Sequence, residues 1–307
     1  MEQNKVQSFL HDFLNMHGTK IKKFFLYFLL IDIGFVFLYP TIYMVTVSLM
    51  PVSDLVNPTI KWIPTHLDLS NFGQAADTMQ YGKVLVHTVL MAGGASLLQI
   101  VSCSMAGYAL ARCNVPLKKV WVAALVFVFL VPDTLTLVPQ YVLFNTYHMI
   151  GSLGSIFLPA LLGQGLNSSL FVLIFMQSFQ SYPKSYEEAA RLDGANRFEI
   201  FLKVAIPMVV PVIVLTFLFS FVWYWNETAK SGLYLDGKFL TLPLQLENFD
   251  SLFGSAYPSA AGSAMNRLNE RIQMAATLLA FLPVMVLYLF LQKHFVEEIE
   301  STGITGE

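Results

Sequence analysis

The stretch from Pro183 to Pro211, PKSYEEAARLDGANRFEIFLKVAIPMVVP, decides how the rest of the chain is arranged. Long apolar runs flank it on both sides. A charged side chain inside a bilayer is costly unless it is paired or faces water, so this stretch must lie in water or against a polar partner. Its charged residues include Glu187, Glu188, Arg191, Asp193, Arg197, Glu199 and Lys203.

The order of residues within this stretch predicts a short helix, a turn and a second helix. Pro183 suits a first helical turn, and the acids Glu187 and Glu188 lie early, where they complement the helix dipole. Gly194 can adopt the left-handed conformation that ends one helix and starts another at an angle. The small side chains of Ala189-Ala190 would let a neighbouring backbone approach closely. A solvated helix between two membrane spans is the simpler alternative.

The composition indicates a membrane protein. Of the 307 residues, 55% are hydrophobic and 12% are charged, and the mean hydropathy is +0.59, which is too apolar for a soluble domain of this size. The net charge of -2 argues against nucleic-acid binding, which requires a basic face. The two cysteines, Cys103 and Cys113, form no disulfide framework.

Six apolar runs predict an all-α polytopic membrane protein, because a transmembrane helix needs about 20 residues to cross the hydrocarbon core. They define an N-terminal segment (1–23), a transmembrane domain (24–293) and a C-terminal tail (294–307). The second run contains many small residues, which allow close helix packing in lipid. The expected spans are 24–49, 84–110, 120–138, 156–179, 208–225 and 274–291.

Three positions within these runs are candidates for a transport pathway, and each has a plainer explanation. Asp133 falls in the third span, where a carboxylate must be paired or face water, unless it only bonds with Thr134 or Thr136. Asp32 lies in the first span but near its basic end. The interruption at Gly163–Asn167 either borders a cavity or is a simple kink.

The distribution of basic residues predicts the orientation. With six spans, twelve of the 18 Lys and Arg residues lie on the same side as Pro183–Pro211, and the other six lie opposite. Since cytoplasmic loops are enriched in Lys and Arg, this stretch and both termini are expected in the cytoplasm.

The same stretch resembles the EAA loop of ABC importer permeases. Glu188-Ala189-Ala190, Asp193-Gly194-Ala195 and Ile206-Pro207 match its order and spacing, although Val204 and Ile206 stand where the family has Ile and Leu. The resemblance implies a type I importer fold in which the loop, 180–207, carries a coupling helix that docks on an ATPase. The implied coupling residues are Glu188, Ala189, Ala190, Asp193, Gly194, Ala195 and Pro207.

Further short motifs resemble those of the carbohydrate-uptake branch of this family, and in particular those of the smaller permease of maltose-type systems. They include Tyr108–Arg112, which is similar to YAFAR, and Thr241–Leu244, which reads TLPL. The pair Trp225-Asn226 matches a family position near the external half of the pathway, and sugars stack on aromatic rings and bond to amides, so the resemblance implies substrate contacts there. An interfacial aromatic belt is the simpler explanation of any one of these aromatic residues. Together with Asp133, the pathway candidates are Gln140, Tyr141, Trp225 and Asn226.

The resemblance implies a permease subunit in the bacterial cytoplasmic membrane that imports a sugar or oligosaccharide by alternating access. Its partners would be a second permease subunit, two ATPase subunits that bind ATP and Mg, and an extracytoplasmic solute-binding protein. The chain itself would need no cofactor or metal and would not be an enzyme. It has no G-x-x-x-x-G-K-[ST], H-E-x-x-H or G-x-S-x-G motif.

Two other function classes remain to be compared. A self-contained ion-coupled secondary transporter would need paired charges within the membrane, whereas Asp32 and Asp133 have no basic partner in a span. A membrane enzyme would need a catalytic constellation, and none is evident. Co-purification with an ATPase through the Glu188 loop would distinguish the importer from both alternatives.

Overall fold

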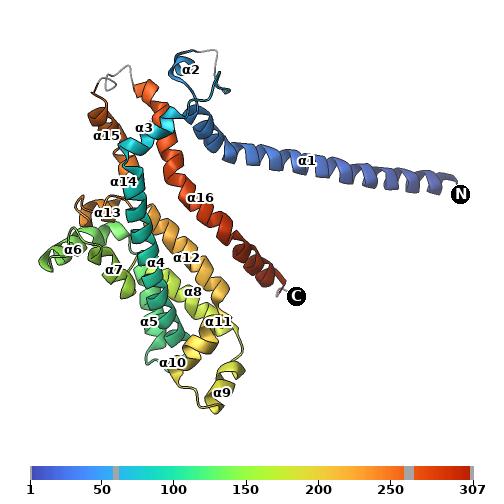
Figure 1. The fold of residues 1–307 in the computed structure, drawn as a ribbon. Helices are drawn as coiled ribbons and strands as arrows, with labels where there is room; N and C mark the ends of the chain where they lie inside the picture. The colour runs from blue at the N-terminus through green and yellow to red at the C-terminus, as the bar shows by residue number, and fades with distance from the viewer. Residues whose placement is uncertain (1, 58–61, 259–265, 305–307) are drawn as a thin grey trace. The chain divides into compact units, whose positions relative to one another are not determined.

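The computed structural model describes residues 2–57, 62–258 and 266–304, and all regular secondary structure in these ranges is helical (Figure 1). The predicted all-α fold is therefore confirmed. The chain divides into two compact units. The first comprises Met1–Phe72 with Ser263–Leu278, and the second comprises Gly73–Gly262 with Leu279–Glu307.

The helical elements follow one another with short connections. In chain order they are α1 (Glu2–Ser48), α2 (Val52–Val56), α3 (Ser70–Thr78), α4 (Tyr81–Arg112), α5 (Lys118–Leu130), α6 (Asp133–Thr146), α7 (Gly154–Leu161), α8 (Ser168–Ser181), α9 (Ser185–Leu192), α10 (Arg197–Ile200), the π-helical turn η1 (Phe201–Ala205), α11 (Ile206–Met208), α12 (Val210–Trp225), α13 (Ala229–Tyr234), α14 (Leu242–Glu247), α15 (Phe249–Ala256) and α16 (Asn266–Ile304).

Several helices are suited to a bilayer. Among the described residues, three stretches are long and apolar enough to cross a membrane by length and composition: Lys22–Ser48, Tyr81–Arg112 and Asn269–Gln292. Two pairs pass the same test only when they are joined across a bend. α5 and α6 meet at 96°, and the segment from α10 to α11 meets α12 at 80°.

The long helix α1 dominates the first unit. It continues without a break through Pro40, because a proline is tolerated within an apolar membrane helix. Its apolar side chains between 24 and 38 are largely exposed, as expected of a lipid-facing surface. Where α1 ends, the buried amide of Asn71 donates hydrogen bonds to the carbonyl oxygens of Ser48 and Met50, at 2.9 and 3.0 Å. These bonds hold the loop that follows.

The helix α4 is the centre of the second unit. It packs along α8, α12 and α7, and α5 lies against α8 (Figure 1). The small residues that the sequence offers in the second predicted span lie at these contacts, and Ala92 and Ala95 are completely buried. Lipid supplies no hydrophobic attraction between helices, so close packing of small residues holds such a bundle together.

Gly107 marks the closest approach of α4 and α8. A Cβ atom at this position would lie 2.6 Å from Cβ of Phe175 and 2.9 Å from the backbone nitrogen of Met176, so neither contact can be relieved by a flexible side chain. We expect Gly107→Val to separate the helices and to prevent accumulation of folded protein, measured by fluorescence-detected size exclusion. Gly82→Val is the matched control, because no atom lies within 4 Å of its added Cβ. Equal yields of the two variants would contradict this packing.

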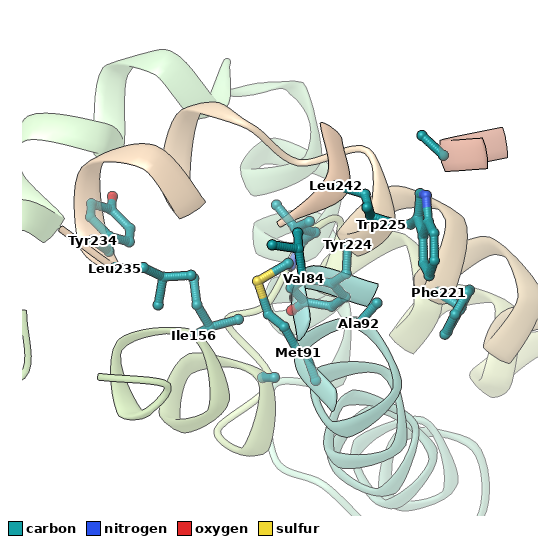
Figure 2. Close-up of a cluster of buried hydrophobic side chains, with 14 of the residues drawn as sticks. Val84, Met91, Ala92, Ile156, Phe221, Tyr224, Trp225, Tyr234, Leu235 and Leu242 are labelled. Carbon is teal, nitrogen blue, oxygen red and sulfur yellow. Dashed lines mark hydrogen bonds between the residues drawn. The ribbon is translucent and has the colours of Figure 1, made fainter. Parts of the chain in front are cut away.

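A hydrophobic core fills the space between α4, α7, α12, α13 and α14 (Figure 2). Aromatic rings from α12 stack into it, and the rings of Phe221 and Trp225 lie 5.5 Å apart. The labelled members of this core are Val84, Met91, Ala92, Ile156, Phe221, Tyr224, Trp225, Tyr234, Leu235 and Leu242.

The third predicted span, 120–138, is wrong in its second half. Helix α5 ends at Leu130, and α6 leaves at 96°. Val131 and Pro132 are extended, with ψ of 123° and 131°, because a residue before proline avoids the helical conformation and proline offers no backbone N–H. Asp133 is consequently the first residue of α6 and does not lie within a continuous span.

The fourth predicted span is interrupted, and the helix of the last predicted span is longer than expected. The expected break at 163–167 is present, since α7 ends at Leu161 and α8 begins at Ser168, with Gly163 at a φ of +72°. At the C-terminus, helix α16 continues to Ile304, so most of the tail expected at 294–307 is helical. The final part of that tail, 305–307, lies outside the described residues.

Candidate functional site: the α9 loop and the α5–α6 cavity

The predicted helix, turn and second helix are present between α8 and α12. Helix α9 ends before Gly194, whose φ of +85° is left-handed, and α10 begins directly after the turn. Asn196 caps α10 by accepting a hydrogen bond from the backbone N–H of Glu199 at 3.0 Å, while its own N–H donates to the Glu199 carboxylate at 2.9 Å. That backbone N–H lowers the pKa of Glu199, and the charge of nearby Lys203 lowers it further.

A buried ionic cluster, here called the Glu187 cluster, anchors the start of α9. The Glu187 carboxylate lies 3.3 Å from Nε of Arg112 and 3.6 Å from Nη2 of Arg191. It also accepts hydrogen bonds from the hydroxyls of Tyr182 at 2.5 Å and Tyr108 at 3.4 Å. Burial, followed by this bond to Glu187, raises the pKa of Tyr182, so its hydroxyl remains a donor.

Arg112 joins this cluster to the central helix, because it is the last residue of α4. Its guanidinium lies 4.2 Å above the ring of Tyr182 and donates a hydrogen bond to the Tyr182 carbonyl oxygen at 2.6 Å. The side chains of Arg112 and Glu187 are each only 4% exposed. A buried ion pair with well-placed hydrogen bonds holds its partners in one geometry, so α9 is fixed to the end of α4.

The C-terminal end of α9 is exposed. Leu192 is 90% exposed and Phe198, just past the turn, is 60% exposed, so two large apolar side chains are available to a partner at this tip. The predicted coupling residues surround this tip or follow it along the chain. Glu188, Ala189, Asp193, Gly194 and Pro207 are exposed, whereas Ala190 and Ala195 are half-buried.

The second site is a cavity of about 780 Å³, here called the α5–α6 cavity. One wall is the apolar face of α5, and the opposite wall is the broken segment between α7 and α8. Its volume falls in the range of small-ligand sites, which combine apolar walls with a few polar groups. The polar side chains that line it are Asp133, Thr136, Gln140, Gln164, Asn167, Ser168, Ser169 and Lys230.

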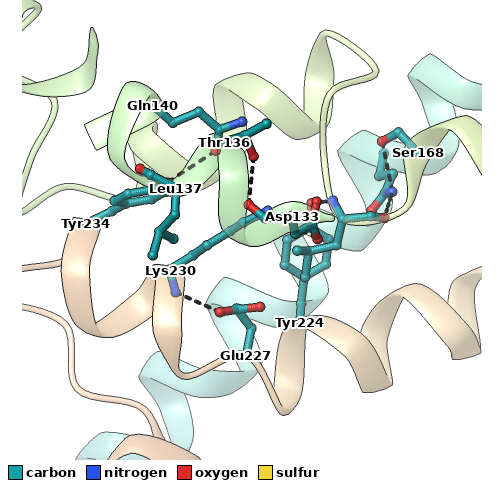
Figure 3. Close-up of polar contacts among 11 residues, drawn as sticks. Asp133, Thr136, Leu137, Gln140, Ser168, Tyr224, Glu227, Lys230 and Tyr234 are labelled. Carbon is teal, nitrogen blue, oxygen red and sulfur yellow. Dashed lines mark hydrogen bonds and ion pairs between the residues drawn. The ribbon is translucent and has the colours of Figure 1, made fainter. Parts of the chain in front are cut away.

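Asp133 has a basic partner that the sequence did not indicate. Its carboxylate lies 3.6 Å from Nζ of Lys230, which extends from α13 towards α6 (Figure 3). The Lys230 side chain is 13% exposed and that of Asp133 is 60% exposed. Thr136 donates a hydrogen bond to the Asp133 carbonyl oxygen, not to its carboxylate. A second link joins the same helices, since Tyr234 donates to Gln140 at 3.2 Å.

A polar node stabilises the broken segment that forms the cavity wall. The buried amide of Gln99 on α4 donates to the carbonyl oxygen of Leu166 at 2.5 Å and to Oγ of Ser168 at 2.9 Å, and it accepts from Ser220 at 2.9 Å. The N–H of Leu166 donates to the hydroxyl of Tyr224 at 3.1 Å. Non-helical backbone at membrane depth requires such hydrogen-bond partners. The break is therefore stabilised by specific hydrogen bonds and is more than a simple kink.

The five predicted pathway residues are only partly brought together. Asp133 and Gln140 line the cavity. Tyr141 instead packs against the hydrophobic core, and Trp225 is buried there with 2% of its surface exposed. Asn226 ends α12 and donates to the carbonyl oxygen of Val222 at 2.9 Å. Trp225 therefore does not line the cavity, because it is buried in the hydrophobic core beside Phe221.

Two important residues were missed by sequence reasoning. Glu187 was treated as one of several charged residues of the loop. In the structure it lies on the inward face of α9 and is buried. Lys230 follows the fifth expected span (208–225), and nothing in its local sequence pairs it with Asp133, which is about a hundred positions away. Among the described residues, no group of three or more His, Cys, Asp or Glu side chains is arranged to hold a metal ion.

Comparison with curated relatives gives consistent matches. The chain is 29% identical over 249 residues to the melibiose/raffinose/stachyose import permease protein MelC of Bacillus subtilis, covering 80% of this chain and 84% of the relative. It is 24% identical over 276 residues to the diacetylchitobiose uptake system permease protein DasC of Streptomyces coelicolor, covering 89% and 93%. It is 27% identical over 261 residues to the polygalacturonan/rhamnogalacturonan transport system permease protein YtcP of Bacillus subtilis, covering 83% and 88%.

A solved structure and a family model agree with these relatives. A crystal structure of a bacterial ABC transporter involved in the import of the acidic polysaccharide alginate matches with a TM-score of 0.75 and 21% identity, covering 90% of this chain and 97% of that one. This likeness confirms the type I importer fold, and the matches do not favour an ion-coupled secondary transporter. The family model of the binding-protein-dependent transport system inner membrane component matches residues 103–301. The chain belongs to this family of multi-pass inner-membrane transport proteins.

Proposed function

We propose that this chain is the permease subunit of an ABC importer for a sugar or oligosaccharide, driven by ATP hydrolysis in separate partner subunits. The observation that carries the proposal is the α9 loop. Its residues have the order of a coupling helix, its apolar tip at Leu192 is bare, and its base is fixed to α4 by the Glu187 cluster. The relatives named above support the substrate class, since all three carry saccharides in their names.

The mechanism follows from this rigid attachment. When a partner ATPase binds the tip of α9 and moves, it displaces the base of α9. The buried ion pair of Glu187 and Arg112 then transmits this displacement to α4. Helix α4 packs against α8 and α12, so these helices move with it and change access to the cavity. The ATP and Mg belong to the partner subunits, and this chain contributes no catalytic group.

The remaining assignments complete this picture. Both termini and the α9 loop lie in the cytoplasm, in line with the excess of Lys and Arg on that side. A second permease subunit closes the pathway, and an extracytoplasmic solute-binding protein delivers the substrate. Within this chain the substrate contacts come from Gln140, Gln164 and Asn167, whose amides suit sugar hydroxyls, and from the Asp133–Lys230 pair.

The test combines assembly with transport. The tagged chain is purified from its native host, co-purifying ATPase is measured, and uptake of a panel of labelled saccharides is compared between the wild type and a deletion strain. We expect a nucleotide-dependent complex and loss of uptake of one saccharide class. Uptake that continues without any ATPase partner, or driven by an ion gradient alone, would refute the proposal.

The Asp133–Lys230 pair yields a prediction for the cavity. We expect Lys230→Met and Asp133→Asn each to lower the uptake rate by about two- to fivefold, the range of a partly exposed ion pair. The double variant should lose less than the product of the two single effects, because each single change leaves one charge unpaired at the cavity. Lys238→Met is the control, since the exposed Lys238 does not line the cavity. Strictly multiplicative effects would exclude a functional pair.

A further inference from the structure

A separate polar pocket of about 440 Å³ lies where α4 ends and where α5 and α9 begin. It shares no lining residue with the α5–α6 cavity. Four cationic and two anionic side chains line it, which leaves a formal excess of two positive charges. These side chains are Arg112, Lys118, Lys184, Arg191, Glu187 and Glu188.

Some of the charged side chains in this pocket have ion-pair partners and others do not. The Glu187 carboxylate is already engaged by Arg112 and Arg191, at 3.3 and 3.6 Å. Within the described ranges, neither Lys118 nor Lys184 has a carboxylate within ion-pair distance. The amino groups of Lys118, at the start of α5, and Lys184, just before α9, thus line one pocket without an ion-pair partner, and the formal excess of positive charge favours a ligand that brings negative charge.

The surroundings of the pocket indicate its depth in the membrane. Next to Lys118, Leu117 lies just before α5 and is 74% exposed, and Val120 and Trp121 on the first turn of α5 are 59% and 56% exposed. Together with α6, α5 is long and apolar enough to enter lipid. Tryptophan at such a position marks the headgroup level of a bilayer. The exposed tip of α9 around Leu192 does not line the pocket, whereas the predicted coupling residue Glu188 does, so the pocket adjoins the surface proposed to dock on the ATPase.

We propose that this pocket binds the phosphate headgroup of an acidic phospholipid, with Lys118 and Lys184 as its principal contacts. Their ammonium groups donate charge-assisted hydrogen bonds to the phosphate oxygens, and the acyl chains lie along the apolar start of α5. Lys184 and Arg191 both belong to the α9 loop and line the pocket, so the bound lipid stabilises the base of α9. The site depends on the membrane setting of the protein but not on the identity of the transported substrate.

Direct lipid binding tests this site. The full chain, with its co-purifying subunits in detergent, is titrated with fluorescent phosphatidylglycerol and with fluorescent phosphatidylcholine. We expect a preference for phosphatidylglycerol, and we expect each of Lys118→Gln and Lys184→Gln to lower its affinity about fivefold, so that the double variant loses roughly 25-fold. The control Lys119→Gln/Lys203→Gln removes the same charge outside the pocket and should change affinity by less than about twofold.

Each alternative has a distinct outcome. Equal losses in the pocket variant and its control would show only general surface attraction and would overturn the site. Displacement of the lipid probe by equimolar glycerol phosphate or inorganic phosphate would assign the pocket to a free anion. Unchanged lipid binding combined with loss of a co-purifying subunit in Lys118→Gln/Lys184→Gln would assign it to a protein contact. If the double variant does not fold, the two single variants decide the question.

Discussion

Replacing Gly194 with valine is expected to abolish uptake while the protein still folds and inserts into the membrane. The φ of +85° is left-handed, and a side chain there costs about 1–2 kcal/mol of local strain. Apart from its two chain neighbours, no atom of the described residues lies within 4 Å of the added Cβ, so the fold itself does not oppose it. The open space is where an ATPase surface would approach. Uptake of the labelled substrate and ATPase co-purification are measured together.

Gly237 provides a matched control for backbone strain. Its φ is +68° and its added Cβ also meets no atom within 4 Å, but it lies in the turn between α13 and α14, away from the α9 loop. Gly237→Val should therefore keep most of its uptake. Gly194→Asn separates strain from bulk, because asparagine tolerates the left-handed conformation; it should still impair uptake. Full uptake by Gly194→Val would remove the case for close docking at this turn.

Glu187→Ala is expected to be the most destabilising single change in the α9 loop. It removes the carboxylate shared by Arg112, Arg191, Tyr182 and Tyr108 and leaves the Arg112 guanidinium buried without its counter-charge. Breaking a buried pair in this way costs about 3–5 kcal/mol. We expect a lower thermal midpoint in detergent, measured by loss of the monodisperse peak after heating, and a fall in uptake.

The neighbouring acid supplies the contrast for this prediction. Glu188 is exposed, so Glu188→Ala should keep the wild-type thermal midpoint and reduce only uptake and ATPase binding. Adding Arg112→Leu to Glu187→Ala should recover part of the lost stability, because an apolar side chain is less costly than an unpaired buried charge. A thermal midpoint that is identical in Glu187→Ala and Glu188→Ala would contradict an anchoring role.

The comparison of sequence and structure is most informative at the loop and at the cavity. The turn at Gly194 and the two helices around it were predictable, because local conformation there follows from glycine and from capping residues. The anchoring role of Glu187 was not, since a helix has an inward face only when its partner, here Arg112, is in place. Asp133 was recognised as a cavity acid, but its partner Lys230 was not.

The amino-acid order by itself determined that the chain is helical, membrane-spanning and interrupted by one charged loop, because these properties depend on local hydropathy, helix signals and short spacings. Only the tertiary structure decided which polar side chains meet. The 96° turn at Pro132 moves Asp133 out of the expected span, and the stacking along α12 buries Trp225. Such outcomes depend on packing between residues that are far apart in the chain, and no local pattern encodes them.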